Sequence, residues 1–227
     1  MDLGIGEAGL RWWFGMLLGH PGFAKLRRLG LRRSTVTDQT LKELAESPQA
    51  GELRHLDLEG HPTLTGAGLA HLARSPHVTG LVSLNLSDTA VRGRDVKKFL
   101  RSPNCRSLRV LYLPNFECAD AIRGAAESPH CANLTTLVVS DGLMSHSADG
   151  ALDLLLKSTN SPNLTYLSVP ITGQRAVEAL LEADHIACPD MQPSRCVTPR
   201  ARQLYRARFG DLYVGGVVQR EKPMFDW

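Results

Sequence analysis

The sequence repeats one leucine pattern, and this repetition constrains the fold more than any other feature. The pattern L-x-x-L-x-L begins at Leu26 and recurs at intervals of 26 to 30 residues. A Ser-Pro pair keeps the same phase, because its proline stands five residues before the opening leucine in four consecutive frames. Two markers in one phase indicate a chain built of similar units. The frames open at Leu26, Leu53, Leu81, Leu108, Leu134 and Leu164.

Each frame predicts a short strand that is followed by a helix. Alternate residues of a strand point to opposite faces, so the leucines share one face and the residues between them share the other. The next apolar residues, such as Val36, Leu41 and Leu44, have a spacing of about three that suits a short helix. Proline then ends the helix. Neither element can bury its leucines alone, so neighbouring units must stack around one continuous core.

These frames resemble the leucine-rich repeat family, and their period with a helix in each repeat is similar to its ribonuclease-inhibitor-like subclass. The segments STVTDQTLKELAESP and LTGAGLAHLARSP are similar to repeats that are common in bacterial proteins of that kind. The resemblance implies an α/β solenoid, with a curved parallel sheet on the concave side and helices on the convex side. The family's asparagine after the strand is replaced by Ser34, Thr89 and Thr172, whose hydroxyls can bond to the turn backbone more weakly.

We predict two parts along the chain. Residues 1–183 form the repeats, with a partial first repeat, in which Leu3 matches the third leucine of the frame, followed by six strand–helix repeats. This start leaves two explanations open: the chain is a fragment of a longer one, or the aromatic residues 12–14 close that end. Residues 184–227 are predicted to form an irregular loop and a C-terminal helical cap.

Two details of these parts can be predicted more closely. The fifth repeat is the longest, and we expect its extra residues in a loop at 140–150, before a helix at 151–157. In the C-terminal part, Pro199 suits the first turn of a helix that Gly210 ends, and residues 212–218 suit a final strand.

Composition favours a soluble globular protein, with 43% apolar and 22% charged residues. The longest apolar run, Trp12 to Gly19, is far too short to cross a bilayer. A net charge of +3 is too mild to indicate nucleic acid by itself. Five cysteines, an odd number, fit a reducing compartment, and the first residues lack the basic start of a signal peptide. We therefore expect a cytoplasmic protein that does not contact membranes.

The residues that could carry chemistry fit structural explanations better. Cys105, Cys118 and Cys131 occupy apolar positions of the frames, where a thiol packs as a small hydrophobe. Cys188 and Cys196 lie in the irregular loop, where a zinc site or a disulfide is a less favoured alternative. The glycine pattern GIGEAG lacks the preceding strand that a dinucleotide site requires. The histidines have no nucleophile at a recognisable spacing, so we predict no cofactor, no metal and no catalysis.

The strand residues between the leucines remain to carry function. Parallel sheets are normally covered on both faces, so a bare, partly polar face is most simply explained as a surface for a partner. We expect a protein of unknown identity, with Tyr112 and Tyr166 as anchors and Arg28 and Asp57 setting orientation. The predicted contacts are Arg28, His55, Asp57, Glu59, Ser83, Asn85, Tyr112, Thr136, Val138, Tyr166 and Ser168.

The predicted function is therefore a protein–protein interaction module without catalysis or a small-molecule substrate. The alternative is the recognition part of a larger enzyme, a ligase- or hydrolase-type effector whose catalytic domain is absent from this chain. A contact through the basic C-terminal helix, at Arg202 and Arg206, is a further alternative to the strand face.

Overall fold

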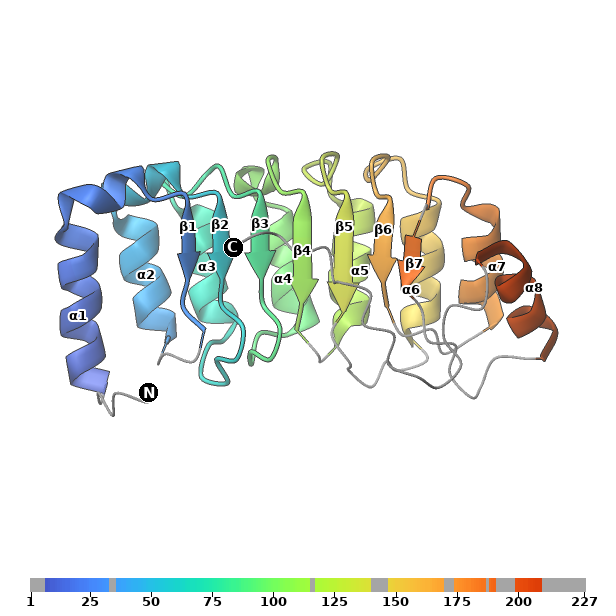
Figure 1. Cartoon of the computed structure of the whole chain (residues 1–227), viewed down its shortest axis with the longest axis horizontal. Coiled ribbons are helices and arrows are strands. Elements are labelled where there is room, and N and C mark those ends of the chain that lie inside the picture. Colours follow the sequence, from blue (N-terminus) through green and yellow to red (C-terminus); the bar gives the residue numbers. More distant parts are fainter. Residues whose placement is uncertain are drawn as a thin grey trace.

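The computed structural model describes residues 7–32, 36–114, 117–139, 147–169, 174–186, 188–190 and 199–209. Over these residues the chain is an α/β protein with one all-parallel sheet of seven strands. The strands follow one another across the sheet in the order of the sequence. Figure 1 shows α3 to α6 in a row behind the sheet, with α1 and α2 beyond its β1 edge and α7 and α8 beyond its β7 edge. No helix in the described part is long and apolar enough to cross a lipid bilayer.

The strands are short and alternate with helices of two or three turns. The strands are β1 (Arg28–Gly30), β2 (His55–Asp57), β3 (Ser83–Asn85), β4 (Val110–Leu113), β5 (Thr136–Val139), β6 (Tyr166–Ser168) and β7 (Cys188–Asp190). The helices are α1 (Glu7–Gly19), α2 (Asp38–Glu46), α3 (Gly66–Arg74), α4 (Gly93–Leu100), α5 (Cys118–Glu127), α6 (Ser147–Leu156), α7 (Gln174–Glu182) and α8 (Pro199–Phe209). Three short 3-10 turns, η1 (Pro21–Lys25), η2 (Pro48–Glu52) and η3 (Pro103–Cys105), begin with the prolines that precede β1, β2 and β4.

The predicted register is confirmed in all six frames. Arg28 pairs with His55, His55 with Ser83, and the same row continues to Tyr166 in β6. The second row runs from Gly30 in β1 to Ser168 in β6. The leucines between these rows all face the helices and are buried in one apolar cluster. The alternation within the leucine frame therefore sorts the side chains onto the faces that it predicts.

The serines of three consecutive Ser-Pro pairs join neighbouring units. Ser75 Oγ, which follows α3, donates a hydrogen bond of 2.6 Å to the carbonyl of Ala45 in α2. Ser102 Oγ donates at the same distance to Ala73 in α3, and Ser128 Oγ donates to Leu100 in α4. The last carbonyls of a helix have no partner within that helix, so these serines satisfy groups that would otherwise need water. The sequence predicted that the proline ends the helix. It did not predict that the serine hydroxyl links neighbouring units by hydrogen bonds.

Aspartate at the start of α2 aligns the next helix. Asp38 Oδ1 accepts hydrogen bonds from the backbone nitrogens of Thr65, at 2.8 Å, and Gly68, at 2.9 Å. Its other oxygen accepts from the hydroxyl of Thr65 at 2.6 Å. These donors belong to the first turn of α3, where backbone N–H groups have no partner within the helix. The side chain of one unit therefore caps the helix of the next.

Two expectations about the second half of the chain need correction. The segment after residue 183 was expected to be irregular, yet Cys188–Asp190 pairs with β6 and extends the sheet. The loop expected through residue 150 is wrong at its end, because α6 already begins at Ser147. The predicted C-terminal helix is confirmed as α8, and Arg208 holds it to the end of α7 by bonds to Leu180 O and Ala183 O. Gly210 and the strand expected at residues 212–218 lie outside the described residues.

The buried leucines predict a large difference between two leucine-to-alanine substitutions. Leu111 in β4 has no exposed surface, whereas Leu154 in α6 is 44% exposed. Leu111→Ala should lower the free energy of unfolding by about 2–5 kcal/mol, because it leaves a cavity in the core. Leu154→Ala, the matched control, should change it by less than about 1 kcal/mol. Urea denaturation measures both, and equal losses would contradict the assignment of the two faces.

Candidate partner-binding face of the sheet

The side of the sheet away from the helices, here called the strand face, carries the predicted contact residues. The first row consists of Arg28, His55, Ser83, Val110, Thr136 and Tyr166, which are neighbours across six strands. The second row contains Asp57, Asn85, Tyr112, Val138 and Ser168. With strands about 4.8 Å apart, six strands present a face that is roughly 25 Å wide. The predicted set is therefore brought together on one surface.

The strand face is much less open than the sequence predicts. Five of the eleven predicted contacts are buried, namely Asp57, Ser83, Asn85, Tyr112 and Thr136. Arg28 is exposed, and the remaining five, His55, Glu59, Val138, Tyr166 and Ser168, are half-buried. Tyr112, which was expected to be an anchor, is only 9% exposed, so little of its ring is available to a partner. Accessible side chains stand at the two ends of the face, and buried ones fill its middle.

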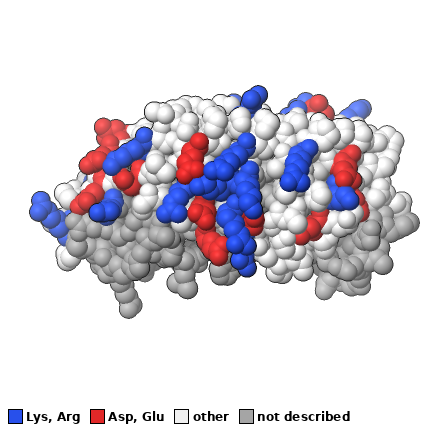
Figure 2. Space-filling model, turned by 180° about the vertical axis from the view of Figure 1, so that it is seen from behind, with Lys and Arg blue, Asp and Glu red and all other residues white. Residues whose placement is uncertain are grey.

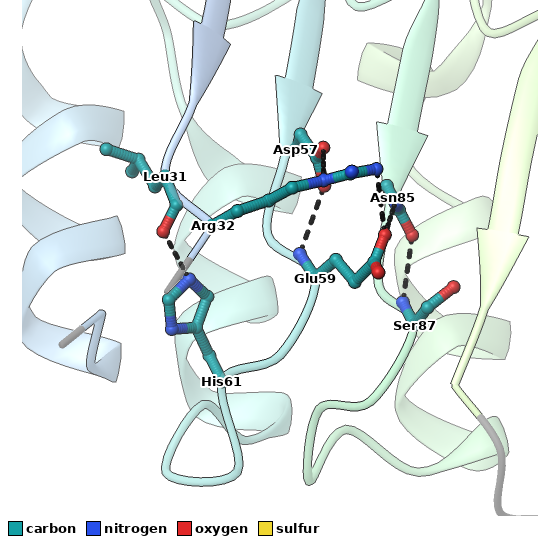
Figure 3. Close-up of polar contacts among 7 residues, drawn as sticks. All are labelled: Leu31, Arg32, Asp57, Glu59, His61, Asn85 and Ser87. Atoms are coloured by element: carbon teal, nitrogen blue, oxygen red, sulfur yellow. Dashed lines mark hydrogen bonds and ion pairs between the residues drawn. The ribbon is translucent and has the colours of Figure 1, made fainter. Parts of the chain in front are cut away.

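Three of the predicted contact residues belong to a partly exposed polar network, shown in Figure 3. Arg32 Nε donates to one carboxylate oxygen of Asp57, and its Nη2 lies 2.8 Å from Glu59 Oε2. The same Glu59 oxygen accepts a hydrogen bond of 3.0 Å from Asn85 Nδ2. Arg32 is not among the predicted contacts, although its position directly after the first leucine frame sets it beside Asp57. These groups satisfy one another and hold the ends of β1, β2 and β3 together.

Asp57 and Asn85 also shape the turns that follow their strands. Asp57 Oδ1 accepts a hydrogen bond of 3.1 Å from Glu59 N, and Asn85 Oδ1 accepts one of 3.0 Å from Ser87 N. Such bonds to the backbone two residues ahead are typical of aspartate and asparagine in turns. Asp57 therefore has a structural role in this turn, and the orienting role in binding stays a prediction. Further along one of these turns, Thr89 Oγ1 donates to Leu86 O at 2.7 Å, as expected for a hydroxyl that replaces asparagine.

Burial changes the proton affinity of two residues of the strand face. Burial raises the pKa of Tyr112; the charge of Arg32 lowers it, and the carboxylates of Asp57 and Glu59 raise it. Burial lowers the pKa of His55, and the positive charge of Arg28 lowers it further. Tyr112 is therefore neutral at physiological pH, and His55 is held toward its neutral form. His55 is a neighbour of Ser83 in the register, but Ser83 Oγ makes no hydrogen bond to any described residue, so the two side chains are not linked as a base and a nucleophile.

Ser83 is the exception to the satisfied groups on this face. Ser83 has no exposed surface, and its Oγ has no hydrogen-bond partner among the residues that the structure describes. The register places it between His55 of β2 and Val110 of β4. A buried hydroxyl without a partner destabilises the fold by about 1–3 kcal/mol.

The described residues contain no group of three or more His, Cys, Asp and Glu side chains that could hold a metal ion. Cys105, Cys118 and Cys131 are buried in the core, as predicted. Burial raises the pKa of all three thiols, that of Cys131 to about 11, so they remain protonated at neutral pH. The side chains of Cys188 and Cys196, for which a metal or a disulfide was an alternative, lie outside the described residues.

Comparisons with known proteins do not identify the chain. No protein-family model matches the sequence, and no curated protein matches it significantly.

Two serines provide a matched test of the hydrogen bonds. Ser128→Ala removes a hydroxyl that donates to Leu100 O and accepts from His130 N, so it should lower the free energy of unfolding by about 1–3 kcal/mol. Ser83→Ala removes an unpartnered hydroxyl and should leave that free energy unchanged or raise it. Urea denaturation of both variants gives the comparison. A loss at Ser83 as large as that at Ser128 would show that Ser83 has a partner in solution.

Proposed function

We propose that this chain is a leucine-rich repeat protein of the ribonuclease-inhibitor-like type, and that it is a protein-interaction module without catalytic activity. The observation that carries the proposal is the pairing of two continuous rows of side chains across six strands, on a face that none of the described helices covers. The six leucine frames in phase with these strands support the repeat assignment. A curved, solenoid shape is part of the same proposal.

The accessible residues suggest which part of the strand face meets a partner. At the β5–β6 end, Val138, Tyr166 and Ser168 are half-buried and adjoin one another through the register. At the β1–β2 end, exposed Arg28 stands beside half-buried His55. An aromatic side chain contributes much contact area for little conformational entropy, whereas an exposed cation mainly affects association rate. We therefore assign the anchor to Tyr166 and the steering charge to Arg28.

The buried middle of the face has a different role in this proposal. Asp57, Glu59 and Asn85 are tied to Arg32 or to turn backbone, so their substitution would change the surface by disturbing the strand ends. A rigid, preorganised face loses less entropy on binding than a mobile one. The network therefore supports binding by fixing the strands. The larger-enzyme alternative has no feature of the described residues in its favour.

The proposal can be tested by placing a photo-crosslinking phenylalanine analogue at position 166 or position 157 in cells. Tyr166 belongs to the strand face, and Lys157, exposed at the end of α6, is the matched position in the helix layer. We expect a partner adduct from position 166 and none from position 157. Tyr166→Ala should then weaken the captured partner's affinity by about 1–2 kcal/mol or more without changing the unfolding midpoint. Adducts from position 157 alone, or unchanged affinity of the Tyr166→Ala variant, would contradict a binding site on the strand face.

A further inference from the structure

A second charged surface lies on the opposite side of the molecule, on α3, α4 and α5. Six basic residues of these helices and of the C-cap of α4 form what we call the basic helix surface: Arg74, Arg94, Lys97, Lys98, Arg101 and Arg123. The same helices contain three acidic residues, Asp95, Asp120 and Glu127, so three positive charges are unbalanced. The N-cap residues Arg92 and Glu117 carry opposite charges and do not alter this balance.

The helices on either side of this surface have the opposite charge. The sequence of α2 contains three acidic residues and one lysine, that of α6 contains two aspartates, and that of α7 contains two glutamates and one arginine. Figure 2 shows basic side chains gathered in the middle of the helix side, with acidic ones toward both ends. The positive charge is therefore concentrated on three central helices, and does not simply reflect the mild net charge of the whole chain.

Ion pairs engage four of the six cations: Lys98 pairs with Asp95, Arg123 pairs with Asp120, and Lys97 and Arg101 both pair with Glu127. Lys97 Nζ and Arg101 Nη2 lie 2.9 and 3.5 Å from the same oxygen, Glu127 Oε2. The hydrogen bond from Lys97 lowers the pKa of Glu127, and the charges of Lys97 and Arg101 lower it further. The single carboxylate of Glu127 is thus shared by Lys97 and Arg101. Arg74 and Arg94 make no ion pair with any residue that the structure describes.

Close packing joins α4 and α5 into one surface. A Cβ on Gly124 of α5 would lie 2.8 Å from the Cα of Lys97, and a Cβ on Gly93 of α4 would lie 1.7 Å from the carbonyl oxygen of Glu117. Only glycine permits these approaches. Lys98 and Arg101 project from this surface, with side chains 74% and 63% exposed. Cations are therefore held on a rigid base with their charged ends in solvent.

We propose that the basic helix surface binds an acidic segment of a protein. The three carboxylates among the cations favour this partner over nucleic acid. Duplex DNA presents a charge about every 1.7 Å along its axis, so its phosphates would also face Asp95, Asp120 and Glu127. A peptide can place its carboxylates opposite cations and its neutral residues opposite these acids. The surface is independent of the strand face, so the two sites can be occupied together.

The test uses the full chain and a fluorescein-labelled peptide of alternating Glu and Ser residues. Alternate residues of an extended peptide are about 6.8 Å apart, close to the axial rise of about 6 Å between Arg94 and Lys98 on α4. Fluorescence anisotropy at low salt measures the dissociation constant. The triple variant Arg94→Gln, Lys98→Gln, Arg101→Gln should raise this constant about tenfold or more, and added salt should weaken wild-type binding.

The matched control removes the same charge from neighbouring helices through Lys42→Gln, Lys157→Gln and Arg175→Gln. It should raise the dissociation constant by less than about threefold, because long-range attraction falls equally in both variants. Equal weakening in the two triple variants, or no binding of the peptide by wild type, would overturn the proposal. Tighter binding of a single-stranded oligonucleotide of equal charge, lost in the Arg94 triple variant, would overturn it in favour of nucleic acid. Tyr166→Ala should leave peptide binding unchanged, which separates this result from any failure of the strand-face proposal.

Discussion

A leucine on a strand of three or four residues can be buried only by the neighbouring units, and the rest of the structure depends on this constraint. Leu56, Leu84 and Leu111 lie side by side in the register and have no exposed surface. Hydrogen bonds extend the same dependence to the helices, because Ser75 and Ser102 each donate to the helix of the preceding unit. Stability therefore comes mainly from contacts between neighbours, which is the arrangement expected of stacked repeats.

Periodic features of the sequence were sufficient to predict the strands, the register and the inward-facing leucines, because each depends on local alternation. The strand β7 was missed because Cys188-Pro189-Asp190 has no leucine frame, and its pairing comes from the adjacent strand β6. Burial of Asp57, Ser83 and Tyr112 was missed for another reason. Alternation tells which side of a sheet a residue faces, but not whether neighbours such as Arg32 will cover it.

The two sides of the molecule use charge differently. On the strand face, Arg32 is paired with Asp57 and Glu59, so the charges there satisfy one another and fix the ends of the strands. On the helix side, cations outnumber carboxylates across α3 to α5, and Glu127 is shared by two of them. The first arrangement favours rigidity, and the second favours attraction of an oppositely charged partner. Together these arrangements support the proposal of two separate surfaces for protein partners.

The most direct test of whether each unit is stabilised by its neighbours is the coupling energy between two leucine substitutions. A double-mutant cycle of Leu84→Val and Leu111→Val, on adjacent strands, can be compared with a cycle of Leu56→Val and Leu137→Val, on strands β2 and β5. The account predicts a coupling energy of about 0.5 kcal/mol or more for the adjacent pair and less than about 0.3 kcal/mol for the distant pair, which is roughly 14 Å apart. Equal coupling in the two cycles, measured by urea denaturation, would contradict it.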